Sequence, residues 1–168
     1  MGIYAILRLV HILSGVFWAG ANMMFAGFVN PSVKASAPES GKFMQHLARK
    51  SGYPRFAEVT GWLTILAGLW LYWIVSNGFQ ASWFMTHRGI VLTIGGLLAI
   101  ITMVIAYVMQ KPAAKRLGEL GQEIQASGGP PTPEQLAEIQ AQQRKLEQGA
   151  RWSAILLTLA VIGMALSR

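Results

Sequence analysis

Two histidines and two arginines beside apolar stretches are the residues of this chain that could do chemistry. His11 lies inside the first apolar stretch, with Arg8 one helical turn before it. His87 opens a later apolar stretch and is followed directly by Arg88. An ionisable side chain at membrane depth is costly, so its default interpretation is functional. Two imidazoles on different helices can bind one metal ion, or one haem iron from both faces.

We therefore predict that His11 and His87 are axial ligands of haem b, with Arg8 and Arg88 near its propionates. A haem also needs flat space between helices, and small residues would provide it. They recur along three apolar stretches: Gly15, Ala19 and Ala26 with Asn22 on the face of His11, Gly61 and Gly68 on the second, and Gly95, Gly96 and Ala99 on the third. The predicted function is electron transfer or porphyrin oxidation.

Other interpretations of the same residues stay open. The histidines could instead form a copper or ion site. In a further interpretation no cofactor is bound, and the small residues only allow the helices to pack closely. In that last case His11 would hydrogen-bond a neighbouring helix, and the protein would be an accessory or assembly subunit. The chain has no cysteine and no aspartate, so thiolate metal sites, iron–sulfur clusters and thioether-linked haem are excluded.

The elements that must position these residues are transmembrane helices. The chain has 168 residues, of which 53% are hydrophobic and only 12% charged, well below the charge of a soluble domain. Four stretches are long enough to cross a bilayer, at about 3–29, 57–79, 87–109 and 150–166. The first is expected to end at Asn30-Pro31, because proline stops a helix. We predict an all-α fold, a single four-helix transmembrane domain over 1–168.

The long connection between the third and fourth stretches, about 111–149, predicts a helical hairpin. Its apolar residues repeat at helical spacing on both sides of a Ser-Gly-Gly-Pro-Pro break. Thr132, Pro133 and Gln135 then have the types expected at N-cap, N1 and N3 of a new helix. Its apolar stripe could dock a partner through Leu117, Leu120, Leu136 and Ile139 if the hairpin does not bury it. A shorter amphipathic helix is expected within 39–50.

Basic residues give an orientation. Eleven Lys and Arg lie in the connections around 30–56 and 111–151, against three on the opposite side. The positive-inside rule makes both basic connections cytoplasmic and both termini outer, in the inner membrane of a bacterium. The net charge of +7 therefore indicates contact with anionic lipid headgroups of the bilayer, not nucleic acid. A redox partner, a larger membrane complex or a homo-oligomer is compatible with these features.

The stretch Leu9–Gly20, with His11 seven residues before the Trp18-Ala19-Gly20 triplet, resembles the first helix of small bacterial membrane proteins. These are the HemJ-type protoporphyrinogen oxidases, the membrane domain of CopD-type copper-resistance proteins, and uncharacterised membrane proteins of similar length. The resemblance continues through Gly61-Trp62, Gly68-Leu69-Trp70 and His87-Arg88-Gly89. The HemJ resemblance implies a haem-binding four-helix bundle with His11 as a ligand, and the CopD resemblance implies copper handling. The lysine that follows the third-helix histidine in the HemJ type is absent here.

Overall fold

The computed structural model describes residues 2–36 and 40–167, and every regular element in these ranges is helical. Its four long helices run Ile3–Ala35, Tyr53–Val75, His87–Ser127 and Pro133–Leu166, and each is long and apolar enough to cross a membrane. The predicted all-α fold with four spanning helices is confirmed. Arg168 and the side chains of Lys42 and Arg49, which entered the charge count above, lie outside the described part.

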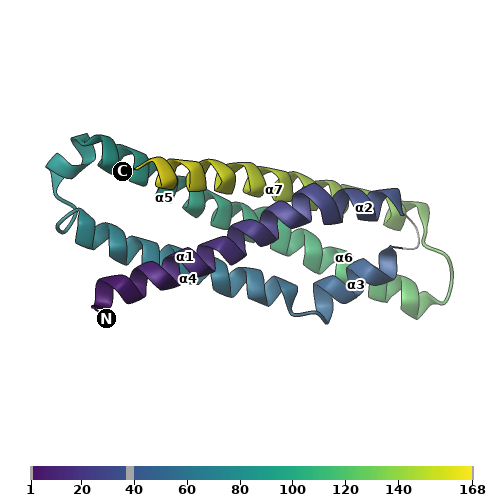
Figure 1. Ribbon diagram of the computed structural model, residues 1–168. Helices are drawn as coiled ribbons and strands as arrows, with labels where there is room; N and C mark the ends of the chain where they lie inside the picture. The colour runs from purple at the N-terminus through teal and green to yellow at the C-terminus, as the bar shows by residue number, and fades with distance from the viewer. Residues whose placement is uncertain (1, 37–39, 168) are drawn as a thin grey trace.

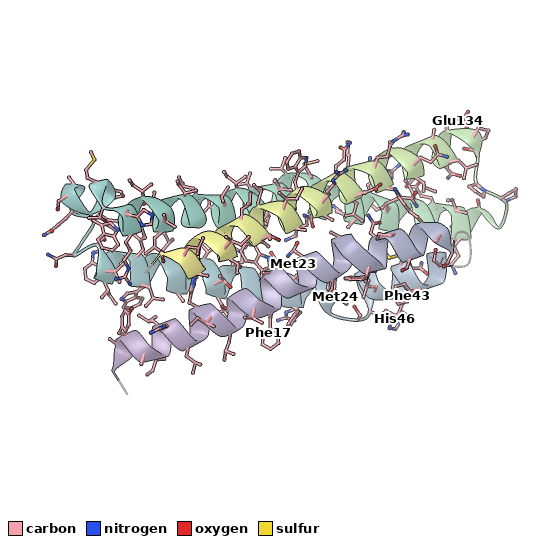
Figure 2. The ribbon with its side chains drawn as sticks, turned by 45° about the horizontal axis from the view of Figure 1, so that its top comes forward. Phe17, Met23, Met24, Phe43, His46 and Glu134 are labelled. Atoms are coloured by element: carbon pink, nitrogen blue, oxygen red, sulfur yellow. The ribbon has the colours of Figure 1, made fainter. Side chains whose placement is uncertain are left out.

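The two ends of the bundle differ. Figure 1 shows both chain termini and the connection between α4 (Tyr53–Val75) and α5 (His87–Ile105) at one end, which we call the terminal end. The opposite end, called the hairpin end, carries the turn between α6 (Lys111–Ser127) and α7 (Pro133–Leu166). The amphipathic helix α3 (Gly41–Arg49) also lies there, with Phe43 and His46 on it (Figure 2).

The first long helix does not stop at Asn30-Pro31, so that expectation is wrong. It comprises α1 (Ile3–Met24), a π-helical segment η1 (Phe25–Val29) and α2 (Asn30–Ala35). In an ordinary helix the ring of Pro31 would clash with the carbonyl of Gly27, and its nitrogen has no hydrogen to donate. In the wider π turn the N–H of Asn30 donates instead to the carbonyl of Phe25, five residues earlier. The helix therefore passes the proline without breaking.

The third long helix passes Pro112 by the same device. The π-helical segment η3 (Ala106–Gln110) links α5 to α6, and the N–H of Lys111 donates to the carbonyl of Ala106. Each π segment ends two residues before its proline. The expected third span, 87–109, is thus the first part of a helix that continues to Ser127.

The second span is displaced from its predicted range of 57–79. α4 begins four residues earlier, at Tyr53, because Pro54 fits the first helical turn, where a missing N–H costs nothing. It ends at Val75, since Asn77 and Gly78 adopt left-handed φ angles of 51° and 79° that close a turn. The expected fourth span, 150–166, ends with α7 at Leu166.

The hairpin forms as the sequence predicts. Thr132 and Gln135 make a reciprocal capping box at the start of α7. Arg116 of α6 donates from Nε to Glu138 of α7 at 2.7 Å, and this guanidinium holds the pKa of the Glu138 carboxyl below its usual range. Leu120 is 1% exposed, so the hairpin buries it, whereas Leu136 is 46% exposed. The stripe considered for docking is thus partly used within the hairpin.

Helix packing divides the bundle into two tight pairs. α1 packs most extensively on α4, and α5 packs most extensively on α7, with narrower contacts from α1 to α7 and from α4 to α5. The buried residues are mostly small, such as Ala67, Ala99 and Ala160. Large apolar side chains point outward instead, as Phe17 does in Figure 2, where it is 53% exposed. Small residues inside and large apolar residues outside are typical of helices packed in lipid.

Candidate histidine site between α1 and α4

His11 lies in the α1–α4 interface, where its Nδ1 atom is 2.8 Å from the backbone carbonyl oxygen of Thr64. In a helix, the side chain four positions later lies beside a residue's carbonyl group. For the carbonyl of Thr64 that position is Gly68, which has no side chain. A Cβ atom at Gly68 would lie 2.8 Å from Cε1 and 3.0 Å from Nδ1 of the imidazole. Glycine at 68 is therefore what lets the ring reach the carbonyl of Thr64.

The hydrogen bond to Thr64 sets the chemistry of the ring. A carbonyl oxygen can only accept, so Nδ1 must carry the proton and Nε2 of the neutral imidazole keeps its lone pair. Nε2 makes no hydrogen bond within the described ranges and is not enclosed by them. Histidines that bind metals commonly donate their other ring N–H to a backbone carbonyl in this way. The imidazole is thus held in the tautomer that a metal ligand requires.

Hydroxyl groups continue the polar contact between α1 and α4 on the hairpin side of His11. Thr64 donates from Oγ1 to the Ser14 hydroxyl at 2.9 Å, and its hydroxyl also lies 2.7 Å from the carbonyl of Thr60. Both side chains are buried. Thr64 also packs against Gly15, where an added Cβ would make an ordinary contact of 3.5 Å with Cγ2 of Thr64. These contacts fix α4 against the face of α1 that carries His11.

Neighbouring side chains fill the space predicted between the small residues. A Cβ at Gly61 would lie 2.7 Å from Cε of Met103 and 3.0 Å from the Trp18 ring. At Gly95 a Cβ would meet Met164 at 3.4 Å. Gly61, Gly68 and Gly95 therefore receive side chains of adjacent helices, whereas nothing lies within 4 Å of a Cβ added at Gly96. At the first three glycines, the flat space expected for a macrocycle is replaced by close packing.

His87 and Arg88 occupy a different setting. They are the first residues of α5 at the terminal end, and both are exposed. The Arg88 guanidinium lies 6.0 Å from the ring centroid of Trp83, a cation–π contact that holds it on the α4–α5 connection. No hydrogen bond joins the two imidazoles in the described structure, and the main packing partner of α5 is α7, not α1. Arg8, by contrast, lies on α1 beside His11 and is exposed.

A second polar cluster, which the sequence did not suggest as a unit, lies near the hairpin end. Lys111 donates to Glu58 at 2.9 Å, and the Tyr107 hydroxyl also donates to that carboxylate. Trp62 donates from Nε1 to the Tyr107 hydroxyl at 3.1 Å. The cluster is exposed, and ion pairing explains it without a ligand. A lysine and a glutamate at corresponding ends of two spans were the only available signal.

In residues 2–36 and 40–167, no three His, Cys, Asp or Glu side chains lie close enough together to hold a metal ion. The site is therefore a single oriented imidazole, with an arginine one turn away. No protein-family model, curated protein or solved structure matches the chain. The fold and site define an all-α protein with four helices able to span a membrane. The HemJ-type and CopD-type resemblance stays a prediction.

Proposed function

We propose that this protein binds haem b at the edge of the α1–α4 pair, with Nε2 of His11 as an axial ligand. The observation that carries the proposal is the hydrogen bond from Nδ1 of His11 to the carbonyl of Thr64. It orients the ring and leaves Nε2 without a partner. Within the described residues this imidazole uses only one of its two nitrogens, so the lone pair of Nε2 is left available to a metal ion.

The proposed site differs from the slot predicted from the sequence. Because neighbouring side chains occupy the space at Gly61, Gly68 and Gly95, the macrocycle would lie against the lipid-facing edge of α1 and α4, where the large apolar side chain of Ile12, next to His11, is exposed. Arg8 is three residues before His11, so it lies on the same side of α1 and nearer the terminal end. Its guanidinium suits a propionate at the membrane boundary.

Bound haem would supply one-electron chemistry, which covers both electron transfer and porphyrin oxidation. The residues of this chain would hold and orient it: Thr64 and Gly68 through the His11 ring, and Arg8 through charge. His87 is assigned no ligand role in this proposal, because it opens α5 on the other helix pair. A copper site at His11 would need further ligands, and the described residues provide no such group.

Titration of the purified protein with hemin in detergent tests the proposal. The wild-type protein and a His46→Ala control should both gain a Soret band, since His46 lies on α3 at the hairpin end. The His11→Ala variant should lose most of it. An equal Soret band in His11→Ala, or no spectral gain in the wild type, would contradict the proposal.

The His87→Ala variant separates the two arrangements considered for the histidines. If both histidines clamped one iron, as the sequence alone predicts, His87→Ala would change the Soret position and the ligand-field bands. If His11 binds at the α1–α4 edge, the His87→Ala spectrum should match the wild type. Arg8→Gln should weaken hemin binding by roughly threefold to tenfold without moving the band, since it removes one partly exposed charge contact.

We further propose that the protein lies in a bacterial inner membrane with the hairpin end in the cytoplasm and both termini outside. The excess of Lys and Arg at the hairpin end supports this orientation. The chain has no cysteine, so single cysteines can report it cleanly. In intact spheroplasts, a membrane-impermeant maleimide should label Gly2→Cys and spare Gly129→Cys. The opposite labelling pattern would show that the protein has the reverse orientation.

A further inference from the structure

A small cavity lies between the first long helix and α7, on the hairpin side of the apolar part of α1. Its volume is about 160 Å³, and it is lined by Ala26, Asn30, Pro31, Lys34, Glu147 and Arg151. Four of these six residues carry polar or charged side chains. One water molecule occupies about 30 Å³ of liquid, so the cavity has room for a polyatomic anion with some water.

The donors in this cavity are not fully used by the chain itself. Lys34 pairs with Glu147 through one of its three N–H groups. Arg151 is exposed and makes no ion pair within the described ranges, and the side-chain amide of Asn30 makes no hydrogen bond there. With Lys34 and Arg151 positive and Glu147 negative, the lining carries a formal charge of +1. The cavity thus combines a net positive charge with N–H groups that make no hydrogen bond to the described residues.

The chain changes from apolar to charged residues at this cavity, so in a bilayer the cavity would lie at the membrane boundary in either orientation of the protein. Asn30 and Pro31 follow directly after the apolar residues of α1 and η1, and Arg151 precedes the apolar part of α7. The π segment η1 contacts α7 and brings Asn30 to it without ending the helix. Basic pockets between transmembrane helices at this level bind phosphate-bearing lipid headgroups.

We propose that this cavity binds one phosphate group, with Arg151, Lys34 and Asn30 as its donors. The guanidinium of Arg151 matches a phosphate with two parallel N–H donors, and Lys34 adds a point charge. Glu147 gives up Lys34 when the anion enters, because a carboxylate and a phosphate compete for the same ammonium group. The phosphate comes either from an anionic phospholipid in the surrounding leaflet or from a soluble phosphate compound.

Lipid binding to the detergent-purified full chain tests this site. Phosphatidylglycerol binding is measured by native mass spectrometry, with phosphatidylcholine as the zwitterionic reference. Arg151→Gln should weaken phosphatidylglycerol binding by about tenfold, the loss expected for a charge-assisted contact. The matched control is Arg144→Gln, which removes the same charge from the same helix two turns earlier and lies outside the cavity lining. Asn30→Ala provides a second variant that leaves the charge and the Lys34–Glu147 pair intact.

The outcomes separate the two sources of phosphate and can overturn the site. Loss in Arg151→Gln and Asn30→Ala but not in Arg144→Gln, with no competition from millimolar inorganic phosphate, supports a lipid headgroup. Competition by inorganic phosphate with the same variant pattern supports a soluble source. Equal loss in Arg144→Gln would show that only bulk charge matters, and this overturns the site. Absence of any preference for phosphatidylglycerol together with no effect of inorganic phosphate would do the same.

Discussion

The two helix pairs of this protein are built alike and filled differently. In each pair the first helix continues past a proline through a π-helical segment, at Pro31 and at Pro112. The chain then turns back and forms the antiparallel second helix of the pair. In each interface a glycine receives a side chain from its partner helix. At Gly68 that side chain is the imidazole of His11, whereas at Gly95 it is the thioether of Met164.

The two interfaces share the same packing geometry, so the side chains they contain distinguish them. The α5–α7 interface uses its glycines for apolar contacts, with Ala99, Leu157 and Ala160 buried beside them. The α1–α4 interface uses the same geometry to hold an ionisable ring against a backbone carbonyl. Polar groups inside a membrane bundle are costly, and packing does not need them. The α1–α4 pair is therefore the one to which we assign the proposed ligand site.

Gly68→Ala should have the largest effect on the comparison. The added Cβ would lie 2.8 Å from the His11 ring, so the imidazole must move away from the Thr64 carbonyl. We expect a loss of about 2 kcal/mol in the free energy of unfolding, typical of overpacking, together with loss of hemin binding. Denaturation in mixed micelles measures the first and the Soret band the second. Gly20→Ala on α1 is the control, since nothing lies within 4 Å of its added Cβ. Equal behaviour of the two variants would remove the special role of Gly68.

Ser153→Ala tests a polar contact between the third long helix and α7. Gln110 of η3 donates to the buried hydroxyl of Ser153 at 2.8 Å. Its loss leaves the partly buried amide of Gln110 without this partner, so we expect a destabilisation of about 1 kcal/mol. Hemin binding should be unaffected, because the contact lies in the other helix pair. If the variant unfolds like the wild type but loses the Soret band, hemin binding depends on the second helix pair as well as on the α1–α4 pair.

Thr64→Val should have a smaller effect on stability. The substitution keeps the shape of the side chain and the backbone carbonyl that His11 uses, but it removes the hydrogen bond to Ser14. Hydrogen bonds between membrane helices average about 0.6 kcal/mol, and we expect a loss of that size. Retention of hemin binding would show that the carbonyl, rather than the hydroxyl, orients His11. Complete loss of binding would assign that role to the hydroxyl.

Gly163→Ala, the counterpart of Gly68→Ala in the second pair, should change least. Its added Cβ would lie 3.6 Å from Cγ1 of Val91, an ordinary contact. The better helix propensity of alanine offsets any small crowding, so stability should stay within about 0.5 kcal/mol of the wild type. A loss as large as that of Gly68→Ala in the same micelle titration would mean that the two interfaces are equally tight.

Much of the fold follows from local patterns. The four apolar stretches, the capping box at Thr132 and the hairpin break at Gly128 are signals within a few residues, and each is found in the structure. The ends of the helices were harder to predict. Proline normally stops a helix, so the continuation past Pro31 depended on a π segment whose hydrogen bonds leave no pattern in residue types.

For the site, the sequence by itself determined that His11 lies within an apolar stretch long enough to cross a bilayer, with Arg8 one helical turn away, because both follow from composition and helical spacing. Only the tertiary structure decided that α4 lies beside His11, that Gly68 exposes the carbonyl of Thr64, and that His87 begins the other pair. Helical periodicity defines the face on which a side chain lies but not which helix covers that face. The choice of neighbour is made by close packing, where a single missing Cβ decides which ring fits.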